Sequence, residues 1–201
     1  SVLPKFLRLL AEHSGQLINY SKLGAGIGVS HKTGQRYLRL LEQILLVSTL
    51  SPWTTNALKR LTKTPKVHFV DSGLLAAARG LTLDRVRGDR RQLGAMLESF
   101  VLSEVQKLSA ESDMRLTSYH FRDAQMNEVD LVLERDDGRV AGIEIKASAT
   151  VNASDFRGLR HLARNCGERF ACGVVLYDSA ETVFFDRNLI AAPISTLWGA
   201  R

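Results

Sequence analysis

The 201-residue sequence contains few cysteines and no long apolar run. Its two cysteines, Cys166 and Cys172, give neither a disulfide framework nor a zinc-binding spacing, so we expect a reducing, cytoplasmic location. No stretch approaches the roughly 18 apolar residues that a membrane span needs. The five histidines are scattered without ligand spacing, and no signal peptide is visible. These shortages argue against a disulfide-stabilised, zinc-binding or membrane-spanning protein.

The charged side chains are divided unevenly along the chain. Residues 1–91 hold 15 basic and 5 acidic side chains, a net charge of +10, whereas residues 92–201 hold 12 and 16, a net charge of −4. An apolar content of 45% is enough for one or two ordinary cores. We therefore expect two modules, and the basic one is expected to face a polyanion.

The basic module has the pattern of a helix-turn-helix. One helix is predicted from about residue 4 to 13, a second after Ser21 as N-cap, and a third over residues 31–43 after Ser30 as N-cap. A glycine-containing turn separates the second helix from the third. The outer face of the third helix carries residues that could reach phosphates or base edges in a major groove: Lys32, Gln35, Arg36 and Arg39.

Two predicted strands follow, over residues 45–50 and 66–70. The segment between them, 51–65, would form a wing, so that residues 1–72 resemble a winged helix. The wing adds further candidate nucleic-acid contacts: Lys59, Arg60 and Lys63. The alternative is a winged helix that serves only for packing or docking.

Residues 24–33 are similar to a phosphate-binding loop but do not satisfy its pattern. That pattern requires a glycine where His31 stands, and it requires a preceding strand that is not predicted here. We therefore predict no ATP site in this chain.

The acidic half contains two predicted strands, over residues 128–134 and 142–146, joined by a turn at residues 136–138. Side chains alternate between faces along a strand. The expected polar face of the first strand carries Glu128, Asp130 and Glu134, opposite Val129, Leu131 and Leu133. On the second strand, Glu144 and Lys146 share a face. A hairpin would gather these carboxylates and the lysine above an apolar floor.

This set of residues suits a divalent cation and a phosphate. Asp130 and Glu144 could supply oxygen ligands to Mg²⁺ or Mn²⁺, which would activate water and stabilise charge on the phosphate. Lys146 would orient water or a phosphoryl oxygen. The pattern Asp…Glu-x-Lys at the ends of adjacent strands resembles the PD-(D/E)XK nuclease superfamily, with Val129 where proline often stands.

A helix predicted over residues 91–109 places Glu98 and Glu104 within its apolar stripe. A buried carboxylate needs a partner or a metal. The resemblance implies that this helix donates a metal ligand, for which Glu98 is the candidate. The alternative is that Glu98 pairs with an arginine or caps a neighbouring element.

Most of residues 16–148 resemble the C-terminal region of bacterial and archaeal AAA-type, STAND-like ATPases, in which a winged helix leads into a PD-(D/E)XK-like domain of unknown function. The segments that carry the resemblance are residues 20–23, 28–30, 37–42, 65–75, 98–101, 128–130 and 143–148, with Gly94, Tyr119 and Arg122. The resemblance implies a nuclease-like fold and an ATPase domain upstream.

The expected architecture is α/β (α+β), with a mixed central sheet. We assign residues 1–72 to a winged helix-turn-helix, 73–90 to a basic connector and 91–201 to a PD-(D/E)XK core. The predicted function is a DNA-binding, Mg²⁺-dependent phosphodiesterase of endonuclease type. The alternative is a non-catalytic DNA-binding or protein-interaction arm of the ATPase. The sequence leaves open the choice between DNA and RNA, the pathway and the oligomeric state.

Overall fold

The computed structural model describes residues 2–56, 58, 60 and 63–199, and it divides the chain into two compact units. The N-terminal unit contains the described residues up to 50 together with 64–100. The C-terminal unit contains those of 51–63 together with 101 onwards. These limits differ from the predicted division at residues 72 and 90. The described residues of 51–63 group with the later part of the chain, and residues 73–100 group with the earlier part.

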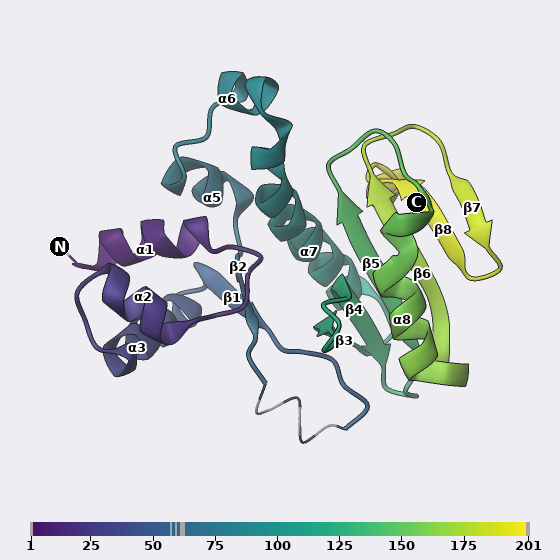
Figure 1. Ribbon diagram of the computed structural model, residues 1–201, viewed down its shortest axis with the longest axis horizontal. Helices are drawn as coiled ribbons and strands as arrows, with labels where there is room; N and C mark the ends of the chain where they lie inside the picture. Colours follow the sequence, from purple (N-terminus) through teal and green to yellow (C-terminus); the bar gives the residue numbers. More distant parts are fainter. Residues whose placement is uncertain (1, 57, 59, 61–62, 200–201) are drawn as a thin grey trace. The chain divides into compact units, whose positions relative to one another are not determined.

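The N-terminal unit begins with three helices, α1 (Val2–Glu12), α2 (Tyr20–Gly26) and α3 (His31–Gln43), as predicted (Figure 1). Each helix turns an apolar stripe inward, which is what a helical period of apolar residues requires. The core that they share with the later elements of this unit includes Phe6, Leu10, Leu23, Leu38, Leu41, Phe69 and Leu75.

The caps of these helices set where each one starts. Ser30 caps α3 as predicted, because its hydroxyl accepts a hydrogen bond from the Thr33 N–H at 3.2 Å. The cap of α2 is Asn19, whose carbonyl Oδ1 accepts from the Lys22 N–H at 2.9 Å. The predicted cap, Ser21, is already inside α2.

Two short antiparallel strands follow the helices, β1 (Val47–Leu50) and β2 (Lys66–Phe69), where strands were predicted. Short helices follow β2: α5 (Ser72–Ala78), α6 (Leu83–Gly88) and the 3₁₀ helix η1 (Arg90–Leu93). The predicted connector over residues 73–90 is therefore largely helical. The long helix α7 (Gly94–Glu111) comes next, close to its predicted range.

The C-terminal unit is built on a six-stranded mixed sheet with strand order β3-β4-β5-β6-β8-β7. β3, β4 and β5 are antiparallel neighbours, β5, β6 and β8 are parallel, and β7 pairs antiparallel with β8. The strands are β3 (Leu116–Arg122), β4 (Glu128–Arg135), β5 (Val140–Lys146), β6 (Phe170–Tyr177), β7 (Val183–Asp186) and β8 (Leu189–Pro193). The expected mixed α/β architecture is confirmed at this level.

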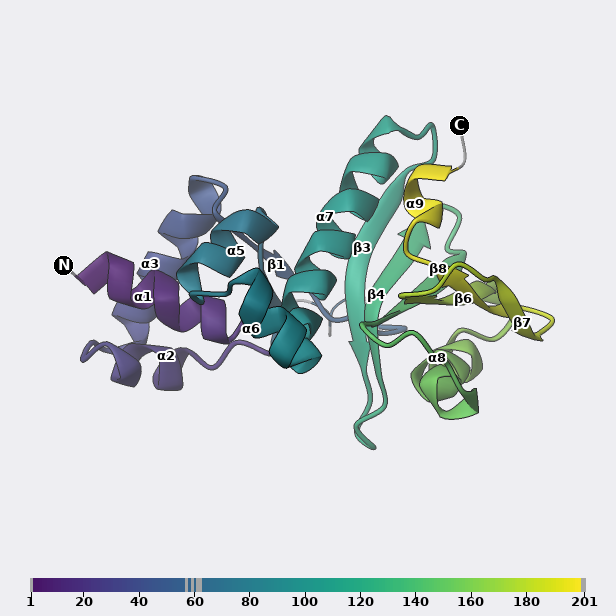
Figure 2. The same cartoon turned by 90° about the horizontal axis from the view of Figure 1, so that it is seen from above.

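Helices cover both faces of this sheet. The 3₁₀ helix η2 (Ala153–Phe156), α8 (Arg157–Cys166) and the 3₁₀ helix η3 (Gly167–Arg169) connect β5 to β6, and α9 (Thr196–Gly199) ends the described chain. Figure 2 shows α8 on one side of the sheet and α9 on the other. The core includes Val129, Val132, Phe156, Leu159, Leu162 and Val175.

Two glycines allow α8 to lie directly on β4 and β5. A Cβ on Gly158 would lie 1.8 Å from the carbonyl oxygen of Glu128, and one on Gly142 would lie 2.6 Å from Leu159. The helix backbone therefore contacts the beginning of β4, and its leucines fill the space above β5. Within the described residues, no helix has the length and apolar character needed to cross a membrane.

Candidate functional site

The predicted hairpin is present as β4 and β5. These strands pair antiparallel from Leu131–Ile143 to Glu134–Val140. Cross-strand partners place their side chains on the same face. Gly142 faces α8, so Glu144 and Lys146, two and four residues further along β5, lie on the α8 face as well.

β4 contains a bulge that the alternation rule did not predict. Tyr119 of β3 pairs with Val132, whereas Phe121 pairs with Val129, so two β4 residues stand opposite the one β3 residue between them. The extra residue puts Val129 and Val132 in the same buried core. The expected strict alternation over residues 128–134 is therefore wrong, because the bulge resets the faces partway along the strand.

The bulge lies at Asp130, the predicted metal ligand. Asp130 Oδ2 accepts a hydrogen bond from the backbone N–H of Ile145 at 2.9 Å. The backbone pairing of β4 with β5 stops one residue away, at Leu131. A side-chain oxygen therefore ties the two strands together where the backbone ladder ends. The carboxylate is thereby fixed beside the strand that carries Glu144.

Glu144 and Lys146 form an ion pair in which Lys146 Nζ donates to Glu144 Oε1 at 2.8 Å. Burial lowers the pKa of Lys146, but Glu144, and then Asp130 and Asp155, outweigh burial and raise that pKa above its ordinary value. Lys146 is therefore protonated at neutral pH. Its electrostatic coupling to both carboxylates brings the predicted triad together in the C-terminal unit.

The donor set suits a hard divalent cation. A carboxylate offers about four lone-pair sites over two oxygens, so the bond from Ile145 leaves Asp130 with acceptor capacity. Mg²⁺ needs only one or two carboxylates when water and phosphate complete its shell. Among the described residues, no group of three or more His, Cys, Asp or Glu side chains has metal-binding geometry. Asp130 and Glu144 could thus hold such an ion only as a two-carboxylate set.

The two predicted helix carboxylates have different surroundings. Glu98 belongs to the N-terminal unit, where a Cβ on Gly15 would lie 2.6 Å from its Oε2. Glu104 belongs to the C-terminal unit, pairs with Lys107 and accepts a hydrogen bond from Trp198 Nε1 at 3.2 Å. The metal role predicted for Glu98 stays a prediction.

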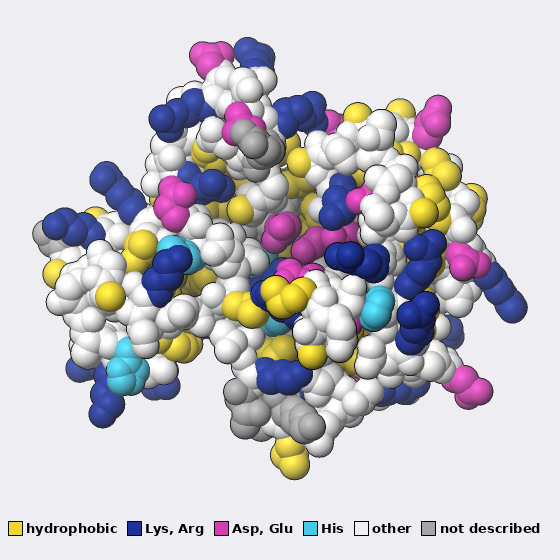
Figure 3. Space-filling view, in the orientation of Figure 1, with side chains coloured by type: hydrophobic (Ala, Val, Ile, Leu, Met, Phe, Trp, Pro, Cys, Tyr) yellow, Lys and Arg dark blue, Asp and Glu magenta, His cyan; other side chains and the backbone are white. Residues whose placement is uncertain are grey.

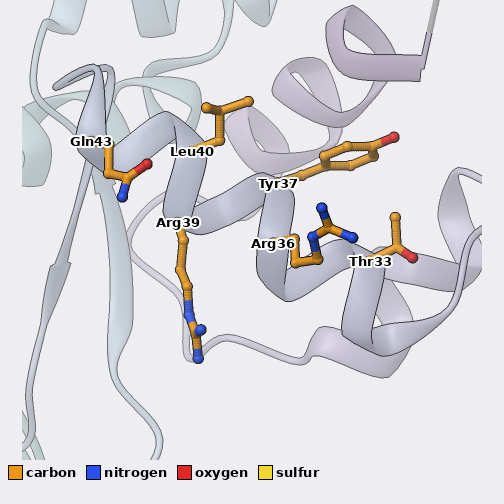
Figure 4. Close-up of a pocket in the computed structure, with 6 residues that line it drawn as sticks. All are labelled: Thr33, Arg36, Tyr37, Arg39, Leu40 and Gln43. Atoms are coloured by element: carbon orange, nitrogen blue, oxygen red, sulfur yellow. The ribbon is translucent and has the colours of Figure 1, made fainter.

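The residues that the sequence predicts as nucleic-acid contacts lie on the outer face of α3. Lys32, Arg36 and Arg39 are exposed, and Gln35 is half-buried. Arg36, Arg39 and Gln43 line a shallow pocket on this helix, together with Tyr37 and Leu40 (Figure 4). The face is positively charged and carries hydrogen-bond donors, which are the features that phosphate and base-edge contacts use.

The predicted wing residues differ in their surroundings. Arg60 is nearly buried in the C-terminal unit, where its Nη2 donates to Glu134 Oε1 at 3.2 Å. Its guanidinium lies 4.7 Å from the ring centroid of Tyr119 and 5.6 Å from that of Trp53. Lys63 is exposed, and Lys59 lies outside the described residues. Arg60 therefore stabilises the sheet, because Glu134 and the two rings already engage its cation.

A further polar network joins the β3–β4 turn to α8. The Asp123 carboxylate accepts from Asn127 Nδ2 at 2.8 Å and from the Gln125 and Asn127 N–H groups at 2.9 Å, and it lies 3.2 Å from His161 Nδ1. From the sequence, His161 is expected to be structural or solvated, and the alternative implied by the resemblance to nucleases is that Arg160 or His161 approaches a phosphate. The polar residues just before the predicted strand over residues 128–134 were a signal in the sequence, and they did not point to α8.

Comparison with known families places the chain in one of them. Residues 93–197 match the model described as Domain of unknown function (DUF4143), and because this match covers more than half of the chain, the chain belongs to that family. Residues 1–85 match a second model, Domain of unknown function (DUF8612).

Two curated relatives are uncharacterized proteins of Mycobacterium bovis and Mycobacterium tuberculosis. Each is 37% identical to this chain over 147 residues, which is 73% of the chain and 32% of the relative. The chain thus matches about a third of the length of these relatives. Among solved structures, a refined half-complex of Thermococcus gammatolerans McrB AAA+ hexamers with bound McrC gives a TM-score of 0.34 at 11% identity, covering 94% of this chain and 69% of that one. A likeness of this size does not establish a shared fold or function.

Proposed function

We propose that this chain is a metal-dependent nuclease-like module of an AAA-type ATPase, and that it hydrolyses phosphodiester bonds of DNA. The observation that carries the proposal is the meeting of Asp130, Glu144 and Lys146 at one end of the β4–β5 hairpin. Two carboxylates and a lysine on adjacent strands are the residues that a PD-(D/E)XK core requires. The six-stranded mixed sheet, with α7 before it and α8 across one face, supports that fold.

Each residue of the triad has a distinct part in this proposal. Asp130 and Glu144 would hold Mg²⁺ or Mn²⁺, which when bound would activate water and neutralise charge on the phosphate. Lys146, kept protonated by Glu144, would orient a phosphoryl oxygen. The Ile145 N–H holds the Asp130 carboxylate in position.

The N-terminal unit would direct the module to DNA as a winged helix. Three helices followed by an antiparallel strand pair support this assignment, and α3 offers the exposed cationic face that a recognition helix needs. The proposed contacts on α3 are Lys32, Gln35, Arg36 and Arg39. Lys63, which belongs to the C-terminal unit, is an additional proposed contact.

The test is cleavage of labelled linear, nicked and branched DNA by the purified chain with Mg²⁺ or Mn²⁺. Lys146→Met should lower the cleavage rate by about 10²–10³-fold, the usual cost of losing one electrostatic stabiliser. Lys107→Met is the matched control, because Lys107 is an exposed lysine that pairs with Glu104 on α7. Equal cleavage by wild type and Lys146→Met would overturn the assignment.

Metal binding gives a second readout that does not depend on turnover. Titration calorimetry with Mn²⁺ should show heat of binding for the wild type and little for Glu144→Gln, whose amide keeps the size of the side chain but removes its charge. Unfolding curves for both proteins would show that the variant is folded. Undiminished Mn²⁺ binding by the variant would exclude Glu144 as a ligand.

A second candidate function is a non-catalytic DNA-binding or protein-interaction arm of the ATPase. The observation that favours it is the length of the relatives, since about two thirds of each lies outside the match with this chain. This alternative predicts DNA binding without Mn²⁺ binding or cleavage. Turnover of DNA by the isolated chain would rule it out.

A further inference from the structure

The outer face of α8 carries a basic stripe that has no part in the site above. At about 100° per residue, four side chains of this helix fall within an arc of about 100°: Arg157, Arg160, His161 and Arg164. The opposite side of the helix is buried through Leu159, Leu162 and Cys166, and α8 contains no acidic residue. Figure 3 shows dark blue side chains gathered over this helix.

The stripe continues into a groove between α8 and the turn from β7 to β8. Among the described residues that line this groove are three arginines, Arg160, Arg164 and Arg187, and a single carboxylate, that of Asp186. The groove therefore has an excess of positive charge. This is notable because residues 92–201 as a whole carry a net charge of −4.

The carboxylates around the stripe leave most of its charge unneutralised. Asp123 faces His161 at 3.2 Å, and Arg160 donates to the carbonyl of Ala153 at 2.7 Å. Within the described part of the chain, no carboxylate oxygen lies within 4.0 Å of Arg157, Arg164 or Arg187 in an ion pair. Like charges at helical spacing of three and four destabilise a helix by about 0.2–0.5 kcal/mol per pair. A polyanion bound along α8 would offset this repulsion.

The stripe repeats the spacing of the proposed recognition helix. Lys32, Gln35, Arg36 and Arg39 of α3 occur at i, i+3, i+4 and i+7, and the four α8 residues have the same spacing. All three cations of the α8 groove are arginines, whose planar guanidinium groups bind phosphate oxygens in pairs. Asp155, in the 3₁₀ helix η2 that leads into α8, is electrostatically coupled to Lys146, and Gly158 of α8 lies against the backbone of Glu128. The beginning of α8 therefore lies near the triad.

We propose that the outer face of α8 and the β7–β8 turn form a second nucleic-acid surface, which contacts the phosphate backbone of the strand that reaches Asp130, Glu144 and Lys146. The inference rests on the proposed function in taking the polyanion to be DNA. It adds a binding surface on the C-terminal unit, independent of α3, that would hold the substrate beside the hairpin.

The test measures binding of a labelled duplex by fluorescence anisotropy in EDTA over a salt series. Arg164→Gln/Arg187→Gln should weaken binding and reduce the slope of log K against log salt by about 2, since each phosphate contact contributes about 0.9. The matched control is Arg115→Gln/Arg139→Gln, two exposed arginines of the same unit at the turn end of the hairpin. The control should keep the wild-type slope.

The variant Arg36→Gln/Arg39→Gln on α3 separates this inference from the proposed function. If it loses affinity while Arg164→Gln/Arg187→Gln binds like the wild type, the α8 surface is excluded and DNA binding through α3 stands. Failure of the wild type to bind any DNA would refute the proposed function itself. Displacement of DNA by polyglutamate of equal charge, as effective as by unlabelled DNA, would show a general anion surface and overturn the nucleic-acid assignment.

Discussion

The carboxylate of Asp130 and the backbone N–H of Ile145 are joined by a hydrogen bond of 2.9 Å, at a bulge in β4. The same side chain that is proposed to hold a metal therefore also connects two central strands. Bulges re-aim side chains, and they are frequent beside active sites. The structural role of Asp130 needs only an acceptor oxygen, whereas its proposed role as a metal ligand needs a negative charge. A substitution that keeps the oxygen and removes the charge can therefore separate the two roles.

Asp130→Asn should keep the fold and lose Mn²⁺ binding, because the amide oxygen can still accept from Ile145. Asp130→Ala should lower the free energy of unfolding by about 1–3 kcal/mol, since it leaves a backbone N–H without its acceptor. Urea unfolding and Mn²⁺ calorimetry on both variants measure these effects. Asp136→Ala, in the exposed β4–β5 turn, is the control and should stay within about 0.5 kcal/mol. Equal destabilisation by Asp130→Asn and Asp130→Ala would contradict a structural role that needs only the acceptor oxygen.

The sequence was sufficient to predict the hairpin because its signals are local. Alternating residues, a turn with Gly138 and a run of β-branched side chains are all read within twenty residues. The bulge depends on how β4 registers against β3, which is a pairing between separate strands. Nothing near Asp130 in the sequence specifies that register. The strand β8 (Leu189–Pro193) was not predicted, for a similar reason. Its apolar run is short, and only its pairing with β6 and β7 identifies it as a strand.

The segment between β1 and β2 is a second feature whose place in the fold could not be predicted from the sequence. Basic residues between two short strands predicted a wing, but Trp53 is buried in the core of the C-terminal unit. Its N–H donates to the carbonyl of His120 in β3 at 2.6 Å, and Arg60 pairs with Glu134. Composition cannot indicate that a loop belongs to the core of a later domain.

Trp53→Ala should therefore destabilise the C-terminal unit, although Trp53 comes from the N-terminal part of the sequence. Removal of a buried tryptophan costs about 3–5 kcal/mol. Hydrogen exchange should show faster exchange along β3, where the Trp53 segment pairs with His120. Leu58→Ala is the control, because the Leu58 side chain is 75% exposed. Unchanged protection of β3 in Trp53→Ala would show that the segment is dispensable.

Gly158→Ala tests the close approach of α8 to β4. The added Cβ would lie 1.8 Å from the carbonyl oxygen of Glu128, so the helix must move away from the strand. Overpacking usually costs about 1–3 kcal/mol, and a clash with backbone should reach at least the upper end of that range. Gly199→Ala meets no atom within 4 Å and should be close to neutral. Thermal unfolding of the two variants compares them, and similar midpoints would contradict this packing.

The Asp123 network predicts a dependence of stability on acid pH. Burial raises the pKa of Asp123, but hydrogen bonds from Asn127 and Gln125, together with His161, outweigh burial and hold that pKa below its ordinary value. A carboxyl with a lower pKa in the folded state binds fewer protons there than in the unfolded state. It therefore contributes stability above the unfolded pKa of about 3.9, and this contribution is lost as pH falls through the folded value.

Asp123→Asn should accordingly be less stable than the wild type at pH 7, and it should lose less stability between pH 5 and pH 3 (roughly the window set by the unfolded pKa). Urea midpoints across this range measure the difference. Asp113→Asn is the control, because Asp113 is exposed just beyond the end of α7 and its replacement should leave the pH profile parallel to that of the wild type. If the Asp123→Asn profile also ran parallel to the wild type, the turn would hold no stabilising charge. A converging profile would show that the charge of the Asp123 carboxylate stabilises the turn at neutral pH.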